Sequence, residues 1–407
     1  MFIELHMLQN FAPSNLNRSD TGAPKDCTFG GTRRARISSQ CIKRAIRKHP
    51  VFEKRVLESG GNVGIRTKRI LKRFNELLQE SGHTSNEIEH VGEVMLGGVK
   101  IGFKSEDKKG EDSDAMAIKK SQYLLYLSET EIQALADLAL EHWDELQNIQ
   151  IAEGEEEGEK EKGVDKRKKK KQSKQAVPKE IQKKIAAALR EPPALAADIA
   201  LFGRMLADDK EMNVDAACQV AHALSTNRVA SMEMDFYTAV DDLLPSEESG
   251  SDMMGIIEFN SACYYRYAQI NLEILKRNLR DDREAAIGAV LGFLEAAALA
   301  VPTGMQNSMA AQNPPSYIRV MLRSSGAPWS LSNAFVQPVR GSDQEDLVCA
   351  SVKSLEAYLQ KLQNAYGSEG FELDCTMDLE GGEGRDTLPQ LLTNLRAALE
   401  TQWAGVR

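Results

Sequence analysis

The segment KDCTFGGTRRARISSQCIKRAIRK, residues 25–48, carries the most informative pattern in the chain. Its second half predicts a helix over 38–49, because Ser38 is a favourable N-cap and Pro50 ends the pattern. Three apolar residues at helical spacing form one side: Ile42, Ala45 and Ile46. Polar and basic residues form the opposite side: Ser39, Gln40, Lys43, Arg44 and Arg47. We therefore expect one side of the helix to pack on a core and the other to present cations.

Two glycines and a cluster of arginines precede this helix. Gly30 and Gly31 permit positive φ angles and the close approach of a ligand to the backbone. The arginines follow directly: Arg33, Arg34 and Arg36. The helix N-terminus behind them is expected to add unpaired amides and the positive end of a dipole. This combination is typical of a site that holds a nucleic-acid backbone without reading its sequence.

Charge is distributed unevenly along the chain. The whole chain has a net charge of −9, whereas residues 33–72 hold 13 basic and two acidic residues and so carry +11. The rest therefore carries −20, the difference between these two values. A local basic field on an acidic body favours a polyanion groove over a protein that coats nucleic acid all over. The alternative is a structural protein with a solvated basic face.

Composition narrows the class of protein further. Hydrophobic residues make up 42% of the 407 residues, which is enough to bury a core in about two to three domain-sized units. No apolar run reaches 18 residues, and the first ten residues carry no basic stretch. We thus expect a cytoplasmic protein without a membrane span or signal peptide. Six cysteines and six histidines show neither CxxC nor HExxH spacing, so we expect no metal and no cofactor.

Outward from residues 25–48 the pattern predicts an α+β chain. The pattern predicts strands at 2–9 and 316–324, a strand or strand-to-turn element at 198–207 and an extended piece at 330–339. It also predicts a loop at 302–308 and a projecting β-hairpin across 225–260. Helical spacing and caps predict helices at 179–190, 213–224, 283–300, 344–366 and 387–402, with Asn213 and Ser128 as N-caps. We expect helices on one face of a small antiparallel sheet, with a largely helical insertion. The charged residues 152–176 predict a solvated linker, with auxiliary nucleic-acid contact as the alternative.

The basic segment and several other blocks closely resemble one known family. This is the family of the backbone subunit of the type I-E CRISPR surveillance complex Cascade, the CasC family. The resemblance begins at SNLNRSDTGAPKD and FGGTRRARISSQCIKRAIRK. It continues in order through DIALFGRMLAD (198–208), NVDAACQVAHALSTN (213–227), DFYTAVDDL (235–243), VPTGMQNSMA (301–310) and SLSNAFVQPV (330–339).

The resemblance implies an architecture. It implies an α+β protein shaped like a right hand, with an RRM-like (ferredoxin-like) palm, a helical fingers insertion and a β-hairpin thumb. By position, the palm covers 1–56, 191–224 and 261–407 with the C-terminal helices, the fingers cover 57–190 including 152–176, and the thumb covers 225–260.

The resemblance also implies a function and partners. Copies of the subunit stack head to tail along a CRISPR RNA, and each thumb kinks the RNA at regular intervals. The remaining bases then pair with the target DNA strand in antiviral defence. Other Cascade subunits and a separate, recruited nuclease-helicase are the further partners implied.

Site residues carry over by position. The resemblance implies that the following contact RNA: Lys25, Arg33, Arg34, Arg36, Ser38, Ser39, Gln40, Lys43, Arg44, Arg47, Thr303, Gly304, Gln306 and Asn307. It implies an apolar wedge at the kinked base: Phe202, Met205, Met253 and Met254. The alternatives are ordinary packing for the wedge residues and turn capping for Gln306 and Asn307.

Two catalytic alternatives stay open beside this non-enzymatic interpretation. Related backbone subunits cleave target RNA with a loop aspartate, a role that Asp26 would take here. One aspartate without an acid–base partner is weak support for that chemistry. A CRISPR RNA-processing endoribonuclease would need a positioned histidine, and none lies in the glycine-rich loop. His49 ends the basic helix, and His222 is expected to pack within the helix 213–224.

Overall fold

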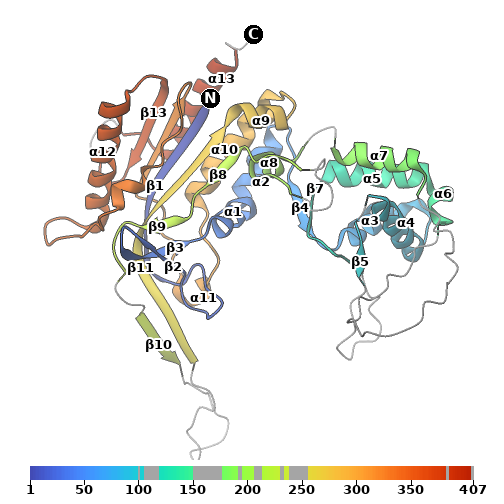
Figure 1. Ribbon diagram of the computed structural model, residues 1–407, viewed down its shortest axis with the longest axis horizontal. Helices are drawn as coiled ribbons and strands as arrows, with labels where there is room; N and C mark the ends of the chain where they lie inside the picture. The colour runs from blue at the N-terminus through green and yellow to red at the C-terminus, as the bar shows by residue number, and fades with distance from the viewer. Residues whose placement is uncertain are drawn as a thin grey trace, which may run out of the picture. The chain divides into compact units, whose positions relative to one another are not determined.

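The computed structural model describes residues 1–99, 101–104, 119–149, 177–190, 195–205, 213–229, 233–237, 255–381 and 385–404. The chain forms two compact units (Figure 1). The first unit comprises residues 1–61 and 216–407, and the second comprises 62–215. Within the described ranges, no helix is both long enough and apolar enough to span a membrane.

The first unit is built on an antiparallel sheet. Its strands are β1 (Phe2–Ser14), β2 (Asp26–Phe29), β3 (Thr32–Ile37), β8 (Cys218–Val220), β9 (Ala223–Ser225), β10 (Glu233–Tyr237), β11 (Gly255–Asn271), β12 (Tyr317–Arg323) and β13 (Phe371–Asp378). They pair in the order β13-β12-β1-β11-β9-β3-β2, and β8 and β10 also pair with β11. Leu5 of β1 lies opposite Ala268 of β11 and Val320 of β12, so the N-terminal strand is central.

Helices cover both faces of this sheet (Figure 1). They are α1 (Ser39–Lys48), α2 (Pro50–Glu58), α9 (Leu272–Asn278), α10 (Arg283–Leu299), α11 (Gln306–Met309), the 3₁₀ helix η3 (Leu331–Phe335), α12 (Leu347–Tyr366) and α13 (Leu388–Ala404). Leu5 and Met7 face α1 and α10, whereas Leu8 packs in a cluster with η3 and α12. The expectation of helices on one face is therefore wrong, because β1 is buried on both sides. Ile3, Leu5 and Met7 lie on one side, and Leu8 lies on the other with the buried polar side chains Glu4 and His6.

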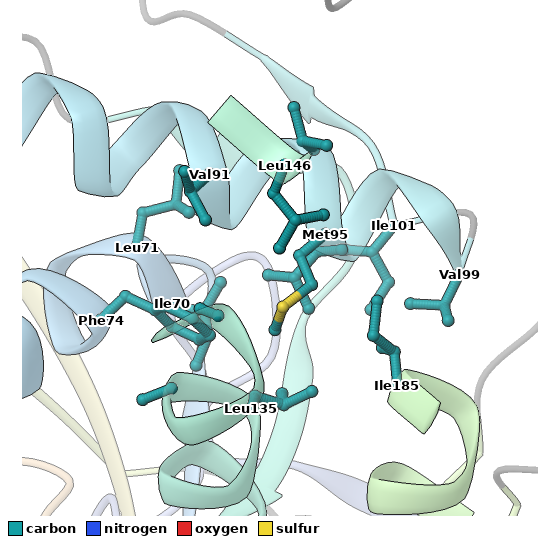
Figure 2. Close-up of a cluster of buried hydrophobic side chains, with 14 of the residues drawn as sticks. Ile70, Leu71, Phe74, Val91, Met95, Val99, Ile101, Leu135, Leu146 and Ile185 are labelled. Atoms are coloured by element: carbon teal, nitrogen blue, oxygen red, sulfur yellow. The ribbon is translucent and has the colours of Figure 1, made fainter. Parts of the chain in front are cut away.

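The second unit is mainly helical. Its elements are β4 (Gly64–Thr67), α3 (Ile70–Leu78), η1 (Gln79–Ser81), α4 (Ser85–Gly98), β5 (Phe103–Lys104), β6 (Lys120–Ser121), β7 (Leu125–Ser128), α5 (Glu129–Glu141), α6 (Trp143–Gln147), α7 (Lys179–Arg190) and α8 (Ala197–Phe202). Figure 2 shows side chains from α3, α4, α5, α6 and α7 converging around Met95. Ser128 caps α5 in a capping box with Glu131, as its sequence predicts.

Most long elements confirm the sequence predictions, and several short ones correct them. The strands near 2–9 and 316–324 form, and so do the helices near 38–49, 179–190, 283–300, 344–366 and 387–402. The hairpin strands β10 and β11 pair antiparallel as predicted, while 152–176 and the hairpin tip at 238–254 lie outside the described residues. Pro50 does not only end a helix: it opens α2 at its first turn.

Three predictions of element type are wrong. Residues 197–202 form helix α8 instead of a strand, and Gly203, with φ +77°, ends it. Residues 213–224 hold β8 and β9 instead of a helix, because both strands pair with β11. The predicted extended piece at 330–339 contains η3. Two further features were not predicted from the sequence: the strand β13 and the β2–β3 hairpin, whose turn is Gly30–Gly31.

Candidate nucleic-acid interface

Helix α1 presents a polar side to solvent, as predicted. Ile42 and Ile46 are buried beneath it, next to Leu5, Met7 and Phe293. The residues on the outer side divide by exposure: Gln40, Arg44 and Lys48 are exposed, whereas Ser39, Lys43 and Arg47 are half-buried. The basic stripe on the surface therefore includes Lys48 and is centred one residue beyond the stripe expected from the sequence.

Side chains of the protein cap the N-terminus of α1. The Ser38 hydroxyl accepts a hydrogen bond from the Cys41 amide at 3.3 Å, which confirms Ser38 as the N-cap. The ring of His222 accepts a second one, from the Ser39 amide to Nδ1 at 3.0 Å. The Ser38 amide donates to Asn17 Oδ1 at 2.8 Å. The expectation of several unpaired amides here is thus wrong, and an anion at this helix end meets side chains first.

Arg34 does not face solvent and cannot contact RNA. Its side chain is fully buried, and Nη1 donates to the carbonyls of Ser225 and Thr226, each at 2.9 Å. Nη2 donates to the carbonyls of Phe335 and Val336 at 2.7 and 3.2 Å. This arginine therefore joins β3 to the end of β9 and to η3. Its predicted RNA contact is corrected, because its donors are satisfied by backbone carbonyls.

Gly30 is needed for close packing, whereas the space around Gly31 is open. Gly30 has φ +57°, and a Cβ there would lie 2.1 Å from the carbonyl oxygen of Val336. The β2–β3 turn thus needs glycine to press against residue 336, which is a different reason from ligand approach. Gly31 has φ +74° with no atom within 4 Å of its Cβ position. A ligand can approach the backbone there.

The remaining basic residues of this hairpin lie near the start of α1. Arg33 is exposed and pairs with Asp26. Arg36 Nε donates to the Asp26 carbonyl at 3.2 Å, and its Nη1 lies 3.5 Å from His222 Nδ1. Lys25 lies beside them, because its amide donates to the Asn17 carbonyl and its carbonyl accepts from the Arg36 amide. Lys25 is half-buried. Asp26 therefore already has a cation as partner.

A pocket of about 490 Å³ lies beside the C-terminal half of α1. Residues 16–18 and 300–304 form its other walls. Among the residues that the structure describes, three cations line it, Arg18, Arg44 and Lys48, and no carboxylate does. Gly304 brings the two loops together, since a Cβ there would lie 2.5 Å from the Leu16 carbonyl oxygen. The pocket is suited to a negatively charged ligand.

The loop after this pocket contains the other predicted RNA contacts. Thr303 and Asn307 are exposed, as a contact role requires. Gln306 Nε2 instead donates to the carbonyls of Pro302 and Ala311, at 3.0 and 3.4 Å. Gln306 thus has the turn-capping role that the sequence left open, at the start of the short helix α11.

The predicted wedge residues are described only in part, and they belong to the second unit where described. Met205 is 85% exposed and Phe202 is half-buried. Between them Arg204 is buried and donates to Glu131 Oε1 at 2.6 Å and to the Leu189 carbonyl at 3.0 Å. Met253 and Met254 lie outside the described residues. Their predicted role stays a prediction.

Sequence reasoning missed three residues that the structure adds to this surface. Lys48 continues the exposed stripe of α1, and Arg18 reaches the pocket from a loop of mixed polar residues. Spacing alone could have indicated Lys48, which stands four residues after Arg44. His222 was assigned to a helix that does not form, so its position at α1 follows only from the pairing of β8 and β9 with β11.

Comparison with known proteins identifies relatives over nearly the whole chain. Residues 3–393 match the model of the CT1975-like protein family. One similar solved chain comes from a "CRISPR RNA-guided surveillance complex, pre-nicking", with a TM-score of 0.78 and 29% identity, covering 98% of this chain and 100% of that one. Another comes from a "CRISPR RNA-guided surveillance complex", with a TM-score of 0.68, 26% identity and the same coverage. No curated protein matches the chain.

Proposed function

The chain belongs to the CT1975-like protein family, and from this premise we propose that it is a CRISPR RNA-binding subunit of a surveillance complex. The observation that carries the proposal is the similarity, over 98% of this chain and 100% of the other, to a chain of an RNA-guided complex. The cationic surface along α1 and the pocket beside it supply a place for the RNA. We propose further that the complex is a Cascade of type I-E and that this chain is its repeated backbone subunit.

The mechanism that we propose is a grip on phosphates. The exposed or half-buried polar side chains along the interface hold successive phosphates of the guide: Lys25, Arg33, Arg36, Ser39, Gln40, Lys43, Arg44, Arg47, Thr303 and Asn307. Such contacts position a strand without reading its bases. The guide bases are then left to pair with a target DNA strand, which delegates sequence recognition to the RNA.

The two units fit the roles proposed for a hand-shaped subunit. The first unit, with its antiparallel sheet, is the RRM-like palm, and the second unit is the fingers insertion. The strands β10 and β11 are the base of the thumb, and Met253 and Met254 at its tip, with Phe202 and Met205, are the proposed wedge at a kinked base. Copies stack head to tail, which is a heterologous contact that generates a helical filament.

We propose no catalytic role for the chain. Asp26, the residue that a backbone nuclease would use, is paired with Arg33. Cleavage of the target is then the task of a separate nuclease-helicase recruited to the complex in the cytoplasm. Changing Asp26→Asn tests this: assembled complexes should keep RNA and interference activity, and loss of a target-RNA cleavage product in this variant would restore the nuclease alternative.

Co-purification tests the proposed function most directly. The chain is expressed with its genomic neighbours and a CRISPR array, purified, and its nucleic acid is extracted and sequenced. We expect uniform short CRISPR RNAs in a large complex with several copies of the chain. Heterogeneous cellular RNA on a monomer, or no RNA, would contradict the proposal.

A charge-reversal pair locates the RNA within the molecule. Lys43→Glu with Arg47→Glu should abolish RNA retention, because two phosphate contacts are replaced by repulsion, while the chain still folds. The matched control is Lys353→Glu with Lys361→Glu, two exposed lysines on α12, at the other face of the sheet. The control should retain RNA. Retention by the α1 variant would contradict the phosphate assignment.

A further inference from the structure

His222 contacts the basic surface at the start of α1, although its sequence neighbours are not basic. It stands between β8 and β9, and its side chain is exposed at the start of α1. Neither the predicted helix nor the resemblance gave it a role in binding. Its ring, however, is within hydrogen-bond distance of β3 and α1 at the same time.

Two donors converge on one nitrogen of this ring. The Ser39 amide donates to Nδ1 at 3.0 Å, and the Arg36 guanidinium lies 3.5 Å from the same atom. Both groups are obligate donors, so Nδ1 must act as the acceptor. A neutral imidazole carries its proton on the other nitrogen when one nitrogen accepts. The fold therefore places the proton of His222 on Nε2.

The surroundings also keep the ring neutral. Partial burial, the Arg36 guanidinium on β3 and the Lys25 ammonium in the preceding loop lower the pKa of His222 below its ordinary value. At pH 7 and above the ring is thus a neutral donor with a fixed tautomer. Within the described part of the chain, Nε2 has no hydrogen-bond partner of its own.

We propose that His222 binds RNA by donating its Nε2–H to a phosphate oxygen of the guide. This inference rests on the proposed function and adds an oriented ring donor to a surface of cations and polar side chains. A phosphodiester fits because it offers only acceptors and is attracted by the nearby cations Lys25 and Arg36. The bond between Ser39 and Nδ1 fixes the direction in which Nε2–H points.

Three substitutions separate binding from capping. His222→Ala removes both functions of the ring. His222→Asn keeps an acceptor near the Nδ1 position, and so keeps the cap on Ser39, but loses the Nε2 donor. His222→Gln places an amide N–H near the Nε2 position but loses the cap. The Asn and Gln variants are therefore matched controls for each other.

Fluorescence anisotropy of the full chain with a labelled single-stranded RNA of 32 nucleotides measures the affinity. We expect His222→Ala and His222→Asn to weaken binding about fivefold to tenfold, and His222→Gln to stay within about twofold of wild type. The ratio between wild type and His222→Ala should stay constant from pH 7 to 8.5, because the neutral form donates. In ¹⁵N NMR of histidine-labelled protein, His222 should show the Nε2–H tautomer.

Each other outcome is decisive. Wild-type affinity in His222→Ala, rescue by Asn instead of Gln, or the Nδ1–H tautomer would overturn the inference. If the Lys43→Glu, Arg47→Glu variant loses RNA while all three His222 variants bind normally, the inference fails and the proposed function stands. If the wild-type chain itself binds no RNA in this assay or on co-purification, the proposed function fails together with the inference.

Discussion

Arg33 and Arg34 are neighbours on β3 and have the same chemistry, yet they belong to different regions of the molecule. Arg34 points inward, is fully buried and donates to four backbone carbonyls. Arg33 points outward, is exposed and pairs with Asp26. The alternation of side chains along a strand separates them. A run of arginines in a sequence can therefore be half structure and half surface.

The same contrast holds between the interior of the sheet and the exposed side of α1. In the interior, Glu4 and Arg323 are buried and bonded at 2.8 Å, and Arg323 also lies 4.1 Å above the Trp329 ring. At the surface, the described residues that line the pocket beside α1 include Arg18, Arg44 and Lys48 but no carboxylate. The buried charges are paired with other groups of the protein, whereas the cations that line the pocket can bind a ligand. Interior substitutions should therefore change stability, and surface substitutions should change affinity.

The largest expected effect on stability is at Arg34. Arg34→Met should lower the free energy of unfolding by about 3–5 kcal/mol, since it removes the guanidinium that donates to four backbone carbonyls, three of them in buried residues. Urea denaturation followed by circular dichroism measures it. A loss below about 1 kcal/mol would mean that water replaces the guanidinium, and the contrast with Arg33 would then disappear.

The next largest difference is expected from salt, which should weaken RNA binding at the α1 surface but hardly change the stability that the buried charges contribute. If about six cations hold RNA phosphates, the log–log slope of affinity against salt is about −4, and a fourfold rise in salt weakens binding roughly 250-fold. The buried charges are screened much less, so the unfolding midpoint should change little over the same range. Titrations from 100 to 400 mM KCl check both. A slope near −1 would contradict a phosphate grip by this surface.

Acid should act on the interior through His6. Its ring is fully buried, and burial with the charges of Arg319 and Arg323 lowers its pKa from 6.5 to about 3. Between these values the unfolded chain binds a proton that the folded chain does not, so stability falls as pH decreases through this window. The loss at pH 5 is about 2 kcal/mol relative to neutral pH. Urea denaturation of wild type and His6→Gln from pH 7.5 to 5 isolates this contribution, because the free energy of unfolding of the variant should not fall in the same way. An equal pH dependence in both proteins would contradict the role of His6.

The smallest expected effect is at Arg33, the matched control for Arg34. Arg33→Met should change the free energy of unfolding by less than about 0.5 kcal/mol, since its ion pair is exposed. It should still weaken RNA binding about threefold, because one phosphate contact is lost. Anisotropy and urea denaturation on the same preparation measure both. A large loss of stability in Arg33→Met would contradict the conclusion that Arg33, unlike Arg34, has no structural role.

Sequence alone predicted the elements whose signals are local. The N-cap Ser38, the capping box of Ser128 with Glu131 and the long apolar pattern of α10 each act within one helix, and all three formed as predicted. The alternation of the hairpin strands was sufficient for β10 and β11 as well.

The failures share a different cause. β8 and β9 have three residues each, so pairing with a distant strand decides their type, and the alanine-rich sequence around them favoured a helix. Arg34 could not be placed, because its acceptors come from residues 225–226 and 335–336. His222 depended in turn on β8 and β9. Most of the cationic stripe on α1, which is local, was predictable; the residues that frame it were not.

The central position of β1 affects how the chain is made. Its partners, β11 and β12, begin at Gly255 and Tyr317, so the first strand synthesised is paired about 240 residues later. At roughly 5–20 residues per second, this interval lasts about 12–50 seconds on the ribosome. Throughout it, a strand that is buried on both sides in the folded protein has neither of its partner strands. The final pairing of β1 can therefore form only after β11 and β12 are made, whereas the contacts within residues 62–215 need no later part of the chain.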